Sequence, residues 1–172
     1  MYTNIRGLNG KRNSLTEILH DNDPQIYLLT ETQLRSNAGI KIDGYNFYSR
    51  KREGKFGGGV GILVRNDILN KTAPHISDRN IEMMWISLRT KEEHPLMLGV
   101  YYGQQESLSK NEIELEMSLL KEEIHEMSCE GEILIAMDGN GKIGLLGEEH
   151  SRNGKLLLYV FAENKPSNLK QQ

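Results

Sequence analysis

Two carboxylates stand at the ends of nearly continuous apolar runs. Glu31 follows the run QIYLLT, and Asp138 follows the run EILIAM and precedes Gly139 and Asn140. If the two runs form neighbouring strands of one sheet, the carboxylates would converge on one rim, where a hard cation such as Mg²⁺ prefers oxygen ligands. Asp, Gly and Asn are also ordinary turn residues, because Gly accepts positive φ and Asx side chains bond nearby backbone. The triplet alone therefore favours a plain turn, and a site needs support from the rest of the chain.

Strands and helices that could position these carboxylates alternate along the sequence. Ser14 and Glu17, and again Ser109 and Glu112, have the S/T-x-x-E spacing of a capping box, which begins a helix. Apolar residues then recur every three or four positions, which is typical of a helix with one buried face. The predicted helices span about residues 14–21, 109–127 and 154–164, and the predicted strands span residues 25–30, 45–49, 59–65, 81–89, 96–102 and 132–137.

Composition and charge limit the organisation of the chain and its partners. The 172 residues with 37% hydrophobic content fit one domain, and helices interleaved with hairpin-like strands favour sheets with helices on their outer faces over a purely parallel α/β fold. A net charge of −3 argues against a purely electrostatic DNA clamp. The single Cys129 forms no internal disulfide, and the sequence shows no targeting segment and no long uncharged apolar stretch. We therefore expect an intracellular protein without a membrane partner, and the nucleus is one compartment open to it.

Two further stretches invite a phosphate-binding interpretation. Gly57, Gly58 and Gly59 are not followed by the G-K-[ST] sequence of a nucleotide-binding loop, so we interpret them as the entry to a hairpin and expect no nucleotide cofactor. The basic run before them either contacts the DNA backbone or forms a solvated hairpin tip. The members of this run are Arg50, Lys51, Arg52 and Lys55.

Six stretches follow one another in a characteristic order: NIRGLNGKRNSLTEIL, DPQIYLLTETQL, GYNFYSRKREGKFGGGVGILVRN, LGVYY, ILIAMDGN and NGKLLLYVFAEN. In this order they resemble the endonuclease/exonuclease/phosphatase family, and within it the apurinic-type endonuclease domains of non-LTR retrotransposons. The resemblance implies a DNase I-like α+β fold, a four-layer α/β/β/α sandwich. It implies one domain over residues 1–165, followed by a polar tail at residues 166–172.

The resemblance also assigns roles to single residues. Glu31 in T-E-T matches the principal metal-binding carboxylate, and Asn4 in N-I-R-G-L matches an Asn that organises the hydrogen bonds of the active site. Tyr101 in V-Y matches the active-site tyrosine. Asp138 matches the residue that orients or deprotonates the attacking water, and Asn140 matches a contact to the scissile phosphate.

The chemistry implied by these roles is metal-dependent hydrolysis of a phosphodiester. A phosphodiester repels nucleophiles, so such a site must neutralise charge on the phosphoryl oxygens and hold a water in line. The implied cofactor is Mg²⁺, with Mn²⁺ as the alternative. The implied partner is double-stranded DNA, which a retrotransposon-type endonuclease would nick.

The sequence departs from the family pattern toward its C-terminal end. Family members close with an acidic residue on a late strand and an Asp-His pair, whereas no Asp-His dipeptide occurs in this chain, which stops at Gln172. The resemblance therefore implies that part of the second sheet is missing, and we assign none of the five histidines to the site. Three interpretations remain: a metal-dependent endonuclease domain, a catalytically incomplete retroelement fragment, and a non-catalytic binding domain on the same scaffold.

Overall fold

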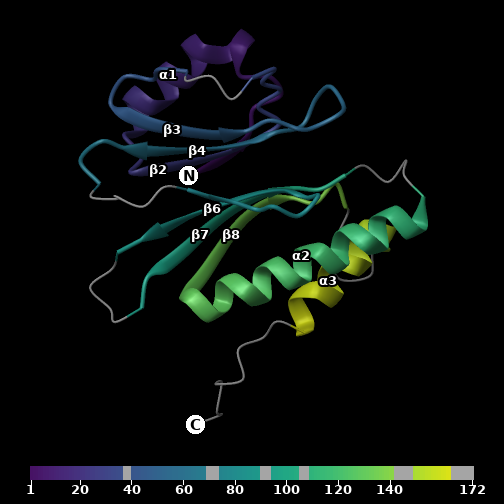
Figure 1. Ribbon diagram of the computed structural model, residues 1–172. Helices are drawn as coiled ribbons and strands as arrows, with labels where there is room; N and C mark the ends of the chain where they lie inside the picture. Colours follow the sequence, from purple (N-terminus) through teal and green to yellow (C-terminus); the bar gives the residue numbers. More distant parts are fainter. Residues whose placement is uncertain (37–39, 69–73, 90–93, 105–108, 142–148, 164–172) are drawn as a thin grey trace.

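Two four-stranded sheets face each other in this chain, and helices cover their outer sides (Figure 1). The computed structural model describes all residues except 37–39, 69–73, 90–93, 105–108, 142–148 and 164–172. The expected combination of sheets with outer helices is confirmed. The expected polar tail lies outside the described residues. No helix in the described ranges is long and apolar enough to cross a membrane.

The first sheet has the strand order β1-β2-β4-β3. Its strands are β1 (Tyr2–Asn4), β2 (Ile26–Thr30), β3 (Tyr45–Arg50) and β4 (Val60–Arg65), with β1 parallel to β2 and the other pairs antiparallel. Its outer side carries the 3₁₀ turn η1 (Asn9–Lys11) and helix α1 (Arg12–Asn22). The capping box predicted at Ser14 is wrong, because η1 runs directly into α1 and places Ser14 inside the helix.

The second sheet has the strand order β5-β6-β7-β8. Its strands are β5 (His75–Ile76), β6 (Glu82–Leu88), β7 (Leu96–Tyr102) and β8 (Glu132–Asp138), and its outer side is covered by α2 (Lys110–Glu130) and α3 (Arg152–Glu163). The capping box predicted at Ser109 is confirmed, since its side chain and that of Glu112 each accept from the other residue's backbone N–H. Strand β5 has only two residues, too few for the period-2 pattern that reveals a strand in a sequence.

Alternation along each strand divides the apolar residues among three cores. Leu28 and Ile62 face the second sheet, whereas Tyr27 and Leu63 face α1. On the second sheet, Met83, Trp85 and Tyr101 pack beneath α2 and α3, while Met84, Val100 and Tyr102 face the first sheet. Consecutive residues of a strand point to opposite faces, so one step along β7 changes which layer a side chain enters.

Candidate active site

The ends of β2 and β8 meet across the gap between the two sheets. Asn4 Nδ2 donates to Glu31 Oε1 at 2.8 Å and to Asp138 Oδ2 at 2.7 Å, so one amide joins both carboxylates. The convergence expected from the sequence is therefore observed. The two strands are not neighbours in one sheet, however, because β2 belongs to the first sheet and β8 to the second.

Strand register explains why these side chains meet. On the second sheet, Glu82 pairs with Tyr102 and Tyr102 pairs with Asp138, so the three form a row across the end of the sheet. On the first sheet, Asn4 pairs with the residue that precedes Glu31. Residues directly opposite in a ladder project from the same face. The two rows face each other, and Asn4 meets Asp138 while Glu31 meets Tyr102.

The tyrosine beside the carboxylates is Tyr102 and not Tyr101. The Tyr102 hydroxyl donates to Glu31 Oε1 at 3.1 Å, whereas the fully buried Tyr101 donates to Glu116 Oε1 at 3.0 Å beneath α2. Burial raises the pKa of the Tyr102 hydroxyl and holds that of Tyr101 well above its ordinary value, and Glu31 adds to the shift at Tyr102. A shift of one residue moves a strand side chain to the other face of the sheet. The expected meeting of Tyr101 with Glu31 and Asp138 is therefore wrong.

The Asp-Gly-Asn triplet is a turn, and its side chains serve the site. Asn140 N–H donates to Asp138 Oδ1 at 3.1 Å, and Asn140 Nδ2 donates to the carbonyl of Gly103 at 2.7 Å. A Cβ on Gly139 would lie 2.3 Å from Leu157 Cδ1 of α3, so any other residue there would require the Leu157 side chain to move. The triplet is therefore both a turn and a part of the candidate site.

Asn153 at the start of α3 supports the same turn from behind. It is 1% exposed, and its Nδ2 donates to the carbonyls of Gln104 at 3.1 Å and Asn140 at 3.3 Å. Sequence reasoning left Gln104 and Asn153 unassigned, because a helix-start Asn gives no sign of which loop it will hold.

Backbone strain is concentrated at this rim. Arg6, Glu31, Gln33 and Asn140 have φ values of 47°, 52°, 51° and 46°, a region that non-glycine residues rarely adopt. The Arg6 N–H also donates to Asn4 Oδ1 at 3.2 Å, which orients the amide toward the two carboxylates. Strained residues of this kind cluster where side chains must be aimed for a function.

The two carboxylates have only neutral partners among the described residues. Asn4, the Tyr102 hydroxyl and the Asn140 backbone N–H donate to Glu31 and Asp138, and no described Lys, Arg or His forms an ion pair with either. No group of three or more His, Cys, Asp or Glu side chains with metal-binding geometry occurs in the described ranges. Mg²⁺ is commonly held by one or two carboxylates together with waters and substrate phosphates, so this donor set fits that ion.

The basic run predicted to contact DNA divides into different roles. Arg50 donates to the carbonyls of Ser77 at 2.7 Å, Met83 at 3.2 Å and Arg79 at 3.2 Å, so its guanidinium is committed to the protein. Burial lowers the pKa of Arg50. A phosphate contact by Arg50 is therefore not supported.

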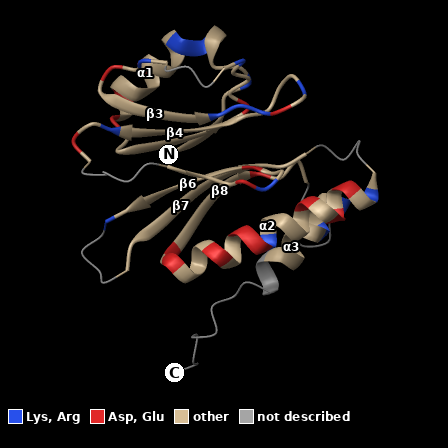
Figure 2. Cartoon of the chain, viewed as in Figure 1, with Lys and Arg blue, Asp and Glu red and all other residues tan. Residues whose placement is uncertain are grey.

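The other three basic residues lie in the turn between β3 and β4, at the right of Figure 2. Arg52 pairs with Glu82, and Lys51 lies 3.6 Å from Glu53. Lys55 is exposed. Of the run, Lys55 is the clearest candidate for a DNA contact.

A basic hollow near the start of α1 was not found from the sequence. It has a volume of about 450 Å³ and is lined in part by Arg12, Arg35 and Lys41, and an adjoining hollow of about 370 Å³ reaches Gly7 and Phe56. Phe56 is 75% exposed, and the Arg35 guanidinium lies 5.9 Å from its ring centroid. The lining comes from η1, α1 and the loop after β2, segments that a sequence pattern does not place together.

Comparison with known proteins agrees with this architecture. A model of the endonuclease/exonuclease/phosphatase family matches residues 1–129. The chain is 28% identical over 110 residues to the RNA-directed DNA polymerase from mobile element jockey of Drosophila funebris, an alignment that covers 63% of this chain and 12% of that protein. The chain therefore spans only a small part of that relative.

Solved structures show the same fold at low identity. The 3′ phosphatase NExo from Neisseria, bound to a product DNA hairpin, has a TM-score of 0.71 and 17% identity, over 94% of this chain and 69% of that chain. The endonuclease domain of TRAS1, a telomere-specific non-LTR retrotransposon, has a TM-score of 0.68 and 17% identity, over 94% of this chain and 70% of that chain. The DNase I-like α+β sandwich expected from the sequence is confirmed, and the chain belongs to the endonuclease/exonuclease/phosphatase family.

Proposed function

We propose that this chain carries the site of a metal-dependent phosphodiesterase that nicks DNA, in the manner of a retrotransposon endonuclease. The observation that supports this most is the pairing of Glu31 and Asp138 through Asn4 without any described cationic partner. Two facing carboxylates with only neutral donors leave negative charge uncompensated, and a divalent cation would compensate it.

Each side chain of the candidate site has a role in this proposed mechanism. Glu31 would hold Mg²⁺ or Mn²⁺, and the hydroxyl of Tyr102 orients its carboxylate. When bound, the metal supplies Lewis-acid stabilisation of the charge on the phosphoryl oxygens. Asp138 would take the proton of the attacking water, since Asn4 and the Asn140 N–H orient its two oxygens. One N–H of the Asn140 amide is used by the carbonyl of Gly103, and the other would donate to a phosphoryl oxygen.

DNA as the substrate is supported by charge and by relatives. Arg12, Arg35 and Lys41 line a basic hollow near the start of α1, and Lys55 is exposed in the turn between β3 and β4. Basic side chains supply the phosphate affinity of DNA-binding proteins. The similar structure of NExo contains a product DNA hairpin, and the similar structure from TRAS1 is an endonuclease domain. Double-stranded DNA is the proposed partner.

One observation favours a second candidate, a site that is catalytically incomplete. The partners that the structure describes for Glu31, Asp138 and Asn140 include no histidine, and the sequence contains no Asp-His dipeptide. The family resemblance implies a histidine that stabilises the developing charge. Loss of one such donor commonly costs about 10²- to 10³-fold in rate.

Nicking of supercoiled plasmid in Mg²⁺ tests both candidates. The 172-residue chain is compared with the same chain extended by a family segment that carries Ser-Asp-His. Both are measured with and without Asp138→Asn. We expect nicking by the extended chain, its loss in the Asp138→Asn variant, and nicking by the unextended chain about 10²- to 10³-fold slower. Nicking by the extended chain that survives both Asp138→Asn and Glu31→Gln would overturn the proposed site.

A further inference from the structure

Arg52 lies against the candidate active site. It follows β3, its guanidinium carbon lies 5.3 Å from the centroid of the Tyr102 ring, and its Nε donates to Glu82 Oε1. The Arg52 side chain is 21% exposed and that of Glu82 is 12% exposed. A cation over an aromatic face is attracted by the ring quadrupole. Arg52 therefore holds both the ring of Tyr102 and a carboxylate of the second sheet.

Glu82 extends the same connection to the strand end that carries Glu31. Its second oxygen accepts the backbone N–H of Gly59, which precedes β4 of the first sheet. The carbonyl of Gly59 accepts the N–H of Thr32 at 3.1 Å, and Thr32 directly follows Glu31. The Glu82 carboxylate thus joins the two sheets. One of its oxygens bonds Arg52, which contacts the Tyr102 ring, and the other bonds the Gly59 N–H, whose residue bonds the backbone beside Glu31.

The glycine run that matches no nucleotide loop makes this approach sterically possible. Gly58 and Gly59 have φ values of +61° and +86°, which glycine adopts without strain. A Cβ on Gly58 would lie 2.5 Å from Arg52 Nε and from Glu82 Oε2, and a Cβ on Gly59 would lie 2.6 Å from Thr32 Oγ1. A side chain at position 58 would displace the Arg52–Glu82 pair, and a side chain at position 59 would crowd Thr32 beside Glu31.

We infer that Arg52 and Glu82 form a positioning pair that sets where the Tyr102 hydroxyl meets the Glu31 carboxylate. The two residues touch no reacting atom and act through Tyr102 and Gly59. This inference rests on the proposed function, because it concerns the geometry of that site. It assigns Arg52 to the protein interior of the site, in contrast to the expected phosphate contact.

Nuclear magnetic resonance of the full chain without metal tests the pair directly. The readouts are the Tyr102 ring resonances, identified with Tyr102→Phe, and the hydrogen-exchange rate of the Gly59 amide. We expect Arg52→Met and Glu82→Gln each to shift the Tyr102 resonances and to speed Gly59 exchange. The double variant should change both readouts by less than the sum of the single changes, because residues of one network couple.

Matched variants separate positioning from other roles of Arg52. Lys55→Met removes an exposed cation from the same turn and should move neither readout. Arg52→Lys keeps the charge without the planar fork and should give an intermediate shift of Tyr102. If Tyr102 and Gly59 stay unchanged in both Arg52→Met and Glu82→Gln, the positioning pair is refuted.

Binding of Mn²⁺, measured by electron paramagnetic resonance, connects the pair to the proposed metal site. Loss of a direct hydrogen-bond partner of a metal ligand typically weakens metal affinity by about 10- to 100-fold. Because Arg52 and Glu82 act on Glu31 through Tyr102 and Gly59, we expect Arg52→Met and Glu82→Gln to weaken it by up to about 10-fold, the lower end of this range. Unchanged affinity in both variants would overturn the inference. If the wild-type chain binds no Mn²⁺, the proposed metal site is wrong, whereas the positioning pair is still decided by the resonances of Tyr102.

Discussion

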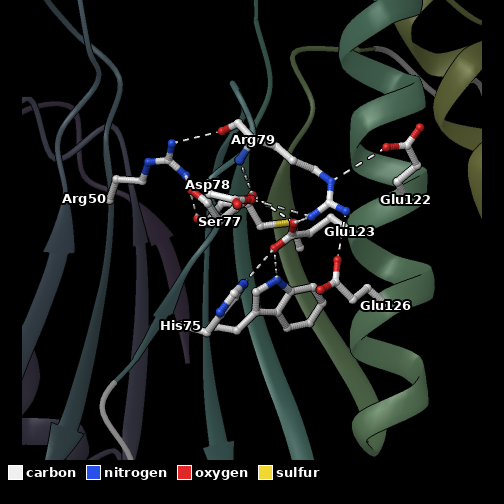
Figure 3. A network of polar contacts seen from close by, with 10 residues as sticks. Arg50, His75, Ser77, Asp78, Arg79, Glu122, Glu123 and Glu126 are labelled. Carbon is white, nitrogen blue, oxygen red and sulfur yellow. Dashed lines mark hydrogen bonds and ion pairs between the residues drawn. The ribbon is translucent and has the colours of Figure 1, made fainter.

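Two groups of carboxylates in this molecule are held in opposite ways. Beneath α2 on the outer side of the second sheet, the fully buried Glu123 accepts hydrogen bonds from Ser77 Oγ at 2.8 Å, Arg79 Nη1 at 2.7 Å and Trp85 Nε1 at 3.1 Å (Figure 3). His75 Nε2 lies 3.5 Å from the same carboxylate. The polar contacts described for this buried carboxylate are thus all with donors, one of them the guanidinium of Arg79.

The same group extends in two directions from Arg79. On α2, Arg79 pairs with Glu126 at 2.8 Å and approaches Glu122 at 3.8 Å, and the hydrogen bond to Glu126 raises the pKa of Arg79. Toward the first sheet, Arg50 donates to the carbonyl groups of Ser77 and Arg79 (Figure 3). The group therefore fastens β3, the segment after β5 and α2 together.

The candidate active site has the opposite charge balance. Glu31 and Asp138 share the amide of Asn4 and receive a further hydroxyl and a backbone N–H, all of them neutral donors. Buried or half-buried charges are normally compensated by an opposite charge or a metal. The contrast indicates that the Glu123 group stabilises the fold, and it agrees with the proposal that the Glu31 and Asp138 group would receive a cation.

Glu123→Ala is expected to have the largest effect on stability. The change leaves the Trp85 Nε1–H and the Ser77 hydroxyl without their buried acceptor and breaks one ion pair of Arg79, and breaking a buried pair costs about 3–5 kcal/mol of unfolding free energy. Thermal and urea unfolding would measure the loss. Glu122→Ala is the matched control, because Glu122 is 60% exposed and its change should stay within about 0.5 kcal/mol. Equal losses of unfolding free energy in the two variants would show that the buried Glu123 and the exposed Glu122 contribute alike to stability.

Adding Mn²⁺ is expected to stabilise the chain through the site alone. At a free concentration of about 100 times its dissociation constant, a ligand that binds only the folded state adds about 2.7 kcal/mol. A melting-temperature series with Mn²⁺ measures this gain. Glu31→Gln should abolish it and Glu122→Gln should preserve it. A gain that persists in Glu31→Gln would place the ion elsewhere.

Asp138→Asn is expected to raise stability without metal. The change removes one of two negative charges that face the same amide, and relief of such functional strain commonly adds about 0.5–2 kcal/mol. Urea unfolding in the presence of a chelator would measure the gain. A clear loss of stability would show that Asp138 serves the fold as Glu123 does, and the comparison of the two groups would fail.

The sequence indicated the two carboxylates and the Asn4 that joins them, and it did not indicate Tyr102. Glu31 and Asp138 end apolar strands, which a linear pattern reveals, and the ordered stretches indicated the family. Tyr102 was missed, because two adjacent tyrosines differ only in the face of β7 from which they project, and register decides that. The roles of Arg50 and Arg52 depend on partners that lie 27 or more positions away along the chain, so no local spacing indicates them.

The Glu123 group was missed for a related reason. Its donors come from β5, β6 and the segment between them, and its carboxylates lie on α2 at residues 122–126. In the sequence, Glu123 looks like one more charge of an acidic helix. Only packing of that helix turn against Trp85 shows that it is buried, and packing of this kind is not encoded in a single local pattern.

Glu116 provides the smallest and sharpest test of the comparison. It is a second buried carboxylate of α2, but among the residues that the structure describes it accepts from the Tyr101 hydroxyl and the Gln104 N–H and contacts no cation. Burial raises its pKa above the ordinary value. Between the unfolded and the folded pKa the folded state binds more protons, so its stabilising contribution is present below the unfolded pKa and is lost as the pH rises through the folded pKa.

The expected outcome is a difference in pH dependence between two variants of one helix. Relative to Glu116→Gln, the wild-type chain should lose stability as the pH rises above about 4.5, with a slope of at most about 1.4 kcal/mol per pH unit for one proton. Urea unfolding between pH 4 and 7 would measure this slope. The Gln side chain in Glu116→Gln keeps one carbonyl oxygen as an acceptor. The loss of a hydrogen bond should therefore change the free energy of unfolding by the same amount at every pH and leave the slope unchanged. If the wild type and Glu116→Gln show parallel pH profiles, the Glu116 carboxyl titrates alike in the folded and unfolded states, and absence of a cationic partner would no longer distinguish it from Glu123.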